Sequence, residues 1–258
     1  SVQREILRRV SLDVGYFRRA WAHFQVTDNL LLAPEDFTRF DIVAPSDPRL
    51  PGGGNFVVGG LYNVNNQKVG QTNSYTTWSN NYGSQTSMYN GVLVNLTART
   101  RNGLTIQGGL NSGSTVLDSC DIREDLPETN PTNPFCRDNP GLITRLTGLA
   151  AYTVPKIDVL VSGTFRSDQG TPLQAQWVVS SAEAAKTLGR PLSGGAPNVT
   201  VNLLAPGEVW GDRVNALDLR FAKILRFGRM RYNVGVDIIN LTNSGAILTY
   251  NQTFNPAV

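Results

Sequence analysis

The sequence predicts an all-β chain that forms part of an antiparallel transmembrane β-barrel, with long extracellular loops at one end and short periplasmic turns at the other. Three observations predict this fold. Segments of the chain alternate apolar residues with polar or small ones, which is the pattern of a β-strand with two different faces. Long and short connections between these segments alternate along the chain. No run of about 18 apolar residues is present, so a transmembrane helix is not expected.

The opening strand is expected to run from Val10 to Asp28. Apolar residues alternate with other residue types from Val10 to Tyr16, and the alternation continues less regularly as far as Ala22. A tilted strand crosses a bilayer in about 9–11 residues, so this strand would span the membrane and project well beyond it.

Aromatic and basic residues in the middle of this strand are expected at the edge of the membrane. Barrel strands carry girdles of aromatic side chains where the bilayer meets water. The aromatic residues assigned to such a girdle are Tyr16, Phe17 and Trp21. The residues expected near or above the outer boundary, where they would meet lipid phosphates or carboxylates of the barrel lumen, are Arg18, Arg19 and His23.

Three further pairs of strands are expected, each joined by a tight turn. The turns lie at residues 101–103, 154–156 and 226–229, and Asn102-Gly103 is a strong hairpin signal. The paired strands are residues 87–100 and 104–110, residues 144–154 and 157–168, and residues 214–225 and 229–241. With the opening strand, the sequence predicts about seven strands of the length that barrels use.

Long loops separate these pairs. They span the polar segment after the opening strand, residues 111–141 and residues 169–212, and residues 182–189 are expected to form one or two helical turns. A β-sandwich has no reason to alternate long and short connections, whereas a transmembrane barrel has short periplasmic turns and long extracellular loops. Backbone groups inside a bilayer must also pair with neighbouring strands, which the barrel achieves.

The two cysteines, Cys120 and Cys136, are expected to form a disulfide. Both lie in a loop rich in Asp, Glu, Asn and Pro, without a histidine or further cysteine that would make a metal site. Closing a loop of about 15 residues contributes about 3 kcal/mol to the free energy of unfolding in the chain-entropy model. A disulfide also implies an oxidising compartment. The acidic residues of this loop lack the spacing of an EF-hand, so a solvated loop is favoured over a calcium site.

Composition and motifs argue against several function classes. The net charge is +3 and no run of basic residues occurs, so a nucleic-acid partner is not expected. His23 is the only histidine, and no nucleophile elbow of the form GxSxG is present. The glycine clusters at 52–54 and 194–195 lack the strand, lysine and helix of a phosphate-binding loop. We expect no catalytic residue, no metal and no cofactor.

Several stretches resemble a known family. They are VSLDVGYFRRAWAHFQVTDN at 10–29, APSDPRLPGGG at 44–54, GGLYNVN at 59–65, TLGRPLSGGA at 187–196 and VGVDIINLTNSGAILTYNQTF at 234–254. Together they resemble the C-terminal barrel of TonB-dependent outer-membrane receptors, nearest to the carboxypeptidase-regulatory-like, Oar-like group. The resemblance covers essentially the whole chain and rests on scaffold and loop motifs.

This resemblance implies a roughly 22-stranded barrel with a plug domain, placed in the bacterial outer membrane. It implies uptake of a scarce ligand, driven by the inner-membrane TonB complex acting through the plug. The expected partners are outer-membrane lipid and lipopolysaccharide, the TonB complex, and an unknown small ligand, glycan or peptide. The sequence lacks a plug and a TonB box and stops at NQTFNPAV, before the closing strand of the family. Residues 1–258 are therefore expected to be a partial receptor barrel.

Ligand contacts are expected from aromatic residues at the ends of the long loops, where they can stack on sugars or hold hydrophobic peptides. The candidates are Trp78, Tyr82 and Trp177, whereas Tyr89 and Trp210 are favoured as girdle residues.

The alternative function is a secreted all-β binding or adhesion module, whose long loops form the binding surface. The two interpretations differ in what the apolar side chains meet, which is lipid in a barrel and an opposing sheet in a sandwich. The residues that distinguish them are Val92, Val94, Val159, Val161, Val234 and Val236.

Overall fold

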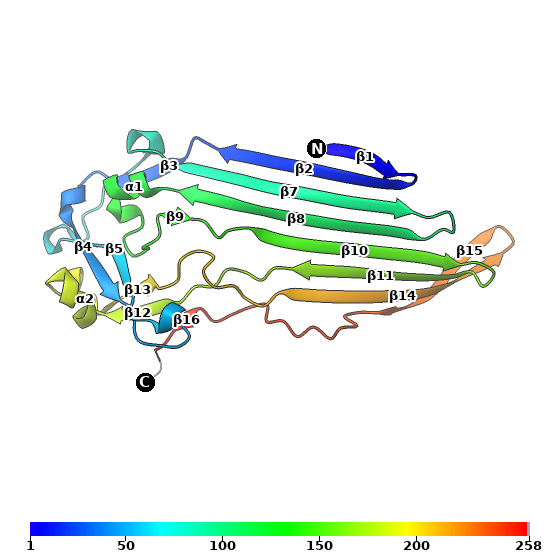
Figure 1. Ribbon diagram of the computed structural model, residues 1–258. Helices are drawn as coiled ribbons and strands as arrows, with labels where there is room; N and C mark the ends of the chain where they lie inside the picture. Colours follow the sequence, from blue (N-terminus) through cyan, green and yellow to red (C-terminus); the bar gives the residue numbers. More distant parts are fainter. Residues whose placement is uncertain (257–258) are drawn as a thin grey trace.

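The computed structural model describes residues 1–256 and has an all-β architecture, with 52% of residues in strands and 12% in helices. A long open sheet fills one end of the molecule, and a compact unit of short strands and helices, here called the cap, fills the other (Figure 1). The described residues form no closed barrel. Within the same range, no helix is long and apolar enough to cross a membrane.

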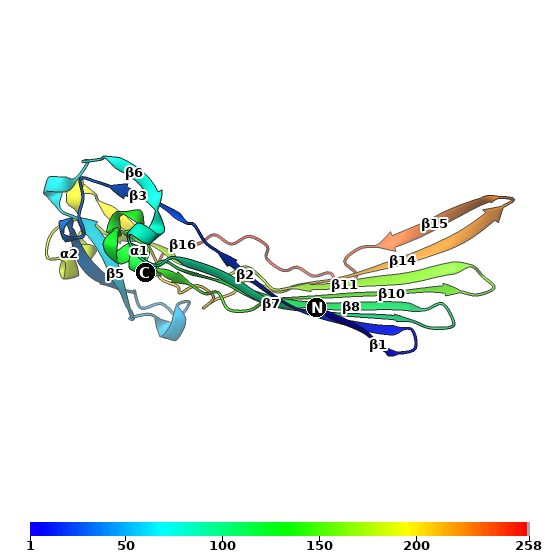
Figure 2. The ribbon, with the colours of Figure 1, turned by 90° about the horizontal axis from the view of Figure 1, so that it is seen from above.

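The long sheet is an antiparallel meander in which consecutive long strands lie side by side. Its order is β1 (Val2–Leu7), β2 (Val10–Trp21), β7 (Thr86–Arg99), β8 (Thr105–Asp118), β10 (Ile143–Val154), β11 (Val159–Asp168), β14 (Val214–Phe227) and β15 (Met230–Ile238), with the short β9 (Arg137–Asp138) beside β8. The β14–β15 hairpin bends away from the plane of the other strands (Figure 2).

Tight turns join the long strands at the end of the sheet remote from the cap (Figure 1). The turns predicted near Gly103, Lys156 and Gly228 are confirmed, and each of these residues has a positive φ, which the tight hairpin requires. A further turn at Arg9 joins β1 to β2. All long connections therefore meet at the opposite end.

The prediction of one opening strand from Val10 to Asp28 is wrong. The strand β2 ends at Trp21, and a separate strand, β3, runs over Gln25–Asn29. Between them His23 takes a left-handed φ of 60°, which interrupts the ladder and turns the chain into the cap. The alternation only becomes less regular before this break, so the pattern alone did not reveal it.

Register places apolar and polar side chains on opposite faces of the sheet, because paired residues on neighbouring strands share a face. The apolar face contains, among others, Val14, Val94, Leu96, Ile106, Leu146, Val161, Phe165, Phe221 and Val236. The polar face contains Asp13, Asn95, Gln107, Thr147, Thr164, Arg166, Asp218 and Asp237. No opposing sheet covers the apolar face in the described part of the chain (Figure 2).

The register places the residues of the predicted aromatic girdle on two different faces of the sheet. Tyr16 pairs with Val92 and lies on the apolar face. Phe17 and Trp21 pair with Gly91 and Ser87 and lie on the polar face. The expectation that all three aromatic residues belong to one girdle is therefore wrong, because consecutive residues of a strand point to opposite sides.

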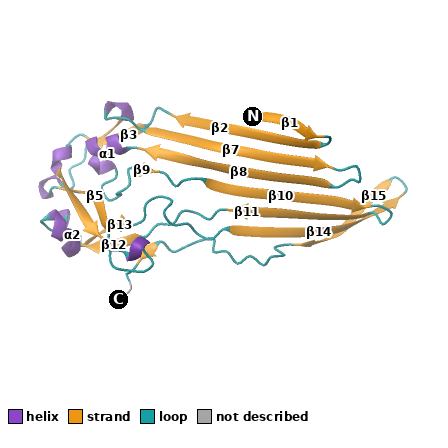
Figure 3. Cartoon of the chain, in the orientation of Figure 1, coloured by secondary structure: helices purple, strands orange, loops and turns teal. Residues whose placement is uncertain are grey.

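The cap is built from the long connections (Figure 3). Its strands form two two-stranded sheets and a three-stranded sheet: β3 with β6 (Ser74–Trp78), β4 (Phe37–Val43) with β5 (Val57–Val64), and β12 (Gln176–Ser180) between β13 (Asn198–Asn202) and β16 (Thr253–Phe254). Its helices are α1 (Cys120–Asp125) and α2 (Ser181–Leu188). Its 3₁₀ turns are η1 (Pro34–Asp36), η2 (Pro51–Gly53), η3 (Asn66–Lys68), η4 (Ser79–Asn81), η5 (Pro127–Thr129) and η6 (Ser193–Gly195).

The helix predicted at 182–189 is confirmed as α2. The side chain of Ser180 caps its first turn by accepting a hydrogen bond from the Glu183 amide at 3.2 Å. The helix ends at Gly189, which takes a left-handed φ of 76°.

The main cluster of buried apolar residues lies in the cap. It joins β4 and β5 to α2, β12, β13 and β16, and its members include Phe40, Ile42, Leu61, Val179, Ala184, Leu188, Val201 and Phe254. These elements come from connections far apart in the sequence, so the core brings the long loops together. The loops of this protein thus contain its dry core, while the long sheet has an uncovered apolar face.

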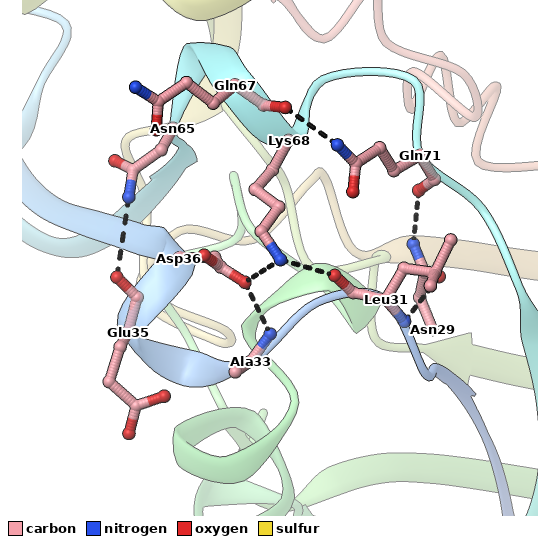
Figure 4. A network of polar contacts seen from close by, with 9 residues as sticks. All are labelled: Asn29, Leu31, Ala33, Glu35, Asp36, Asn65, Gln67, Lys68 and Gln71. Atoms are coloured by element: carbon pink, nitrogen blue, oxygen red, sulfur yellow. Dashed lines mark hydrogen bonds and ion pairs between the residues drawn. The ribbon is translucent and has the colours of Figure 1, made fainter.

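A polar network fastens the segment before β4 to the segment after β5 (Figure 4). The Lys68 ammonium lies 3.0 Å from the Asp36 carboxylate and donates to the Leu31 carbonyl at 2.9 Å. The hydrogen bond from Lys68, followed by that from the Ala33 amide, lowers the pKa of Asp36. Asn29 extends the network by donating to the Gln71 carbonyl at 2.7 Å.

The predicted disulfide between Cys120 and Cys136 is confirmed, and it spans a sequence separation of 16 residues. Cys120 begins α1, and the backbone amide of Ser119 donates to the Cys136 carbonyl at 3.0 Å. The bond therefore ties α1 to the segment that leads into β9. The end of the segment NQTFNPAV, residues 257–258, lies outside the described residues.

Truncation of Leu61 tests the position of the core. Leu61 is 0% exposed, and Leu61→Ala is expected to lower the free energy of unfolding by about 2–5 kcal/mol, because it leaves a cavity in the cap. Val236 is 66% exposed, and Val236→Ala is expected to change this free energy by about 0.5 kcal/mol or less. The measurement is denaturant unfolding of the full chain in detergent micelles, followed by tryptophan fluorescence. Equal losses for both variants would contradict a core placed in the cap.

Candidate functional site

The left-handed turn at His23 forms an aromatic hollow at the junction of sheet and cap. After this turn, β3 pairs with β6 so that Gln25 lies opposite Trp78, and the Ser79 amide donates to the Phe24 carbonyl at 2.9 Å. The pairing brings Trp78 beside His23, with ring centroids 6.1 Å apart in an edge-on arrangement. Two segments distant in sequence therefore place their aromatic rings together.

The aromatic hollow has a volume of about 570 Å³ and lies between residues 21–24 and 78–86. Trp21 and Trp78 line it and are 42% and 50% exposed, so both rings have a face or edge available to a ligand. The Arg19 guanidinium lies 5.8 Å from the centre of the Trp21 ring. Gln85 also lines the hollow, and its side-chain oxygen is buried without a hydrogen-bond partner.

These groups suit a ligand with a flat apolar face. Indole rings stack on such faces, as they do on sugars and aromatic groups.

The hydroxyl of Tyr82, the second predicted contact residue, is used in a contact within the protein and not for a ligand. The phenol donates to the Asp28 carboxylate at 2.5 Å, and Asp28 is buried. This hydrogen bond, followed by burial, raises the pKa of Tyr82 to about 12. Glu128 lies close by, where burial raises the pKa of its carboxyl, and it accepts from the Asn29 amide at 3.3 Å. Tyr82 thus holds β3 beside η4, and Glu128 joins η5 to the same strand.

Trp177, the third predicted contact residue, lies on β12 opposite Val201 and packs against the cap core. The structure therefore brings Trp78 to the aromatic hollow, uses the hydroxyl of Tyr82 within the cap and places Trp177 beside the core. Sequence reasoning did not assign Trp21, His23 and Gln85 to a binding site. The left-handed backbone at His23 brings these residues together, and no residue pattern in the sequence indicated it.

A second hollow, of about 700 Å³, lies on the polar face of the long sheet. Its lining includes Asp13, Asn95, Gln107, Thr147, Arg166 and Asp218. Nearby, the Asp168 carboxylate forms ion pairs with Arg145 at 3.0 Å and with Arg166 at 3.2 Å. This surface offers many hydrogen-bonding groups to water or to a polar ligand.

No group of three or more His, Cys, Asp and Glu side chains within residues 1–256 is arranged to hold a metal ion. The sequence matches no family model, no curated protein and no solved structure.

Titration of the phenols tests the contact between Tyr82 and Asp28. One of the eight tyrosines is expected to ionise near pH 12, because deprotonation removes a hydrogen bond and places a second negative charge beside Asp28. Since folding raises this pKa, the stability it contributes is complete below about pH 10 and is lost as the pH rises towards 12. The measurement is ultraviolet absorbance of the phenolate in the full chain.

Asp28→Asn is expected to return the late phenol towards the ordinary value of about 10. Tyr75→Phe is the matched control, because Tyr75 is exposed and pairs with Asp28 across the β3–β6 ladder. The late step should survive in this variant and disappear in Tyr82→Phe. Ionisation of all phenols in a single step in the unsubstituted chain would rule out the contact.

Proposed function

We propose that this chain is part of an outer-membrane β-barrel receptor of the TonB-dependent type, which takes up a ligand from outside the cell. The observation that carries the proposal is the long antiparallel meander with one exposed apolar face. Contiguous apolar surface of this kind is rare on water-soluble proteins and marks contact with a membrane or a partner.

The apolar face supports contact with lipid. Large apolar side chains are exposed on strand after strand, namely Val14, Val92, Leu96, Ile106, Leu146, Phe165, Phe221, Val234 and Val236. Lipid-facing and lumen-facing residues alternate along the strands of transmembrane barrels. The same alternation here separates an apolar face from one with ion pairs, including Arg220 with Asp237 at 3.1 Å.

The apolar face also has a boundary towards the cap. On this face a row of polar side chains crosses the strands towards the cap, at Arg18, Asn90, Ser112, Thr144, Ser167 and Asn215, and on three strands the apolar residues Ala20, Met88 and Val116 follow it. A band of apolar residues with a polar margin is what a bilayer of finite thickness requires of the strands that cross it. The margin supports an orientation with the cap outside the membrane.

The division between short turns and long connections supports the same orientation. Barrel strands meet in short turns on the periplasmic side and carry their large loops on the extracellular side. The cap, with the aromatic hollow at its base, would then face the medium and meet the ligand first. In this proposal outer-membrane lipid and lipopolysaccharide surround the sheet, and the TonB complex acts through a plug domain of the receptor.

The alternative, a secreted all-β binding module, is favoured by one observation. The cap has a dry core, a disulfide and its own network of polar contacts, all of which suit a unit that binds ligands in water. The long sheet argues against this alternative, since it has no opposing sheet among residues 1–256.

Lipid contact of the two faces distinguishes these functions. Ile106 and Gln107 are neighbours on β8, both exposed, and they lie on the apolar and polar faces respectively. Ile106→Cys and Gln107→Cys are to be labelled with a fluorophore in the full chain, refolded into vesicles of brominated phosphatidylcholine. Strong quenching at 106 and weak quenching at 107 is expected, because bromine atoms on the acyl chains reach only the lipid-facing side.

The existing cysteines form a disulfide, so the introduced thiol is the site of labelling. Weak quenching at both positions, in a chain that stays dissolved without lipid, would favour the secreted binding module. Strong quenching at both positions would contradict a polar lumen.

A further inference from the structure

Two arginines of the cap converge on Gly60. Arg39 lies on β4, Gly60 on β5 and Arg123 on α1. A Cβ placed on Gly60 would lie 3.5 Å from Nη2 of Arg39 and 3.9 Å from Nη1 of Arg123. Gly60 has a φ of 78°, a conformation that side chains rarely adopt, so the chain keeps this position free of a side chain. The two guanidinium groups thus border the same point.

Neither arginine forms an ion pair. Within residues 1–256, no carboxylate lies within 4.0 Å of the guanidinium of Arg39 or Arg123. Asp41 is close in sequence, but its carboxylate accepts the Gly60 amide at 3.1 Å. Two guanidinium groups and one carboxylate thus border Gly60, and positive charge is in excess there.

Arg123 is the more unusual of the two, because it is 8% exposed. Its guanidinium donates to the Gly60 carbonyl and lies 5.4 Å from the centre of the Tyr62 ring, while its Nε is buried without an acceptor. Burial lowers the pKa of Arg123, and the charge of Arg39 acts in the same direction. A buried cation is costly unless it is paired, so an anion bound here would remove a cost of the folded state.

The elements that hold both arginines are fixed in place. The Cys120–Cys136 disulfide and the hydrogen bond from the Arg123 amide to the Ser119 carbonyl, at 3.1 Å, hold α1. On β4, Phe40 follows Arg39 and is buried in the cap core. Rigid supports reduce the entropy lost on binding, which makes the pair a prepared site.

We propose that Arg39 and Arg123 bind a phosphate group beside Gly60. The planar guanidinium presents paired donors that match phosphate oxygens, and two such groups approach one anion from two elements. A phosphate monoester carries a charge of about −1.5 to −2 at neutral pH, which balances two arginines, whereas a carboxylate balances one. This site is independent of the barrel proposal, because it lies wholly within the cap.

Phosphate affinity of the full chain tests the site. Calorimetric titration of the chain in detergent micelles with inorganic phosphate, in a chloride buffer, is expected to show binding. Arg39→Gln is expected to weaken this binding about tenfold or more, since it removes charge-assisted hydrogen bonds. Arg39 is exposed and outside the core, so this variant should keep its fold.

Arg101→Gln is the matched control. It makes the same change of charge at an exposed arginine in the turn between β7 and β8, at the opposite end of the molecule. Its phosphate affinity should equal that of the unsubstituted chain. Arg123→Gln should abolish binding, and if that variant does not fold, Arg39→Gln still decides the question.

A second titration, with micelles of lipopolysaccharide and of its dephosphorylated form, distinguishes a free phosphate from a lipid headgroup as the ligand. Arg39-dependent binding of inorganic phosphate supports a site for free phosphate or a phosphorylated solute. Arg39-dependent binding that requires the lipopolysaccharide phosphates, without binding of inorganic phosphate, supports the same site with a lipid headgroup as its ligand. Absence of both, or equal effects of Arg39→Gln and Arg101→Gln, would overturn the proposal.

Discussion

The backbone hydrogen bonds between neighbouring antiparallel strands are the interaction on which the rest of this structure depends. They set a register from β1 to β15, and the two-residue period of a strand then assigns each side chain to one face. A slip of one residue between β2 and β7 would move Val14 to the face of Asn95. One set of pairings thus produces both the apolar face and the polar face.

The meander also decides where the cap can form. Because the tight turns gather at one end, every long connection emerges at the other, where segments distant in sequence meet. Phe40 and Ile42 from the first connection pack with Val179 and Val201 from a later one. The apolar face of the sheet is not covered by the rest of the chain, whereas the apolar residues of the cap are buried in a core of their own. These two solutions to the hydrophobic effect lie side by side in one chain.

Both proposed binding sites depend on glycine-like backbone geometry at a few positions. His23 turns the chain so that Trp21 and Trp78 border a hollow, although a histidine seldom takes a left-handed conformation. Gly60 places no side chain beside the guanidinium groups of Arg39 and Arg123. Residues held in rare conformations often belong to functional sites, where the surrounding structure maintains them. The aromatic hollow and the arginine pair provide different chemistry, one for flat apolar groups and one for an anion.

The sequence by itself determined the elements whose cause is local. Alternation from Leu104 to Leu110 and turn chemistry at Asn102-Gly103 identify a hairpin, and the helical turns expected at 182–189 correspond to α2. The short β1 and the break at His23 were missed, because β1 has no regular alternation and a rare φ leaves no mark in polarity. Tertiary structure alone decided that Trp177 packs beside the cap core while Trp78 lines a hollow, and that Arg39 meets Arg123. Such neighbours come from separate connections, and only the packing of the cap sets which of them meet.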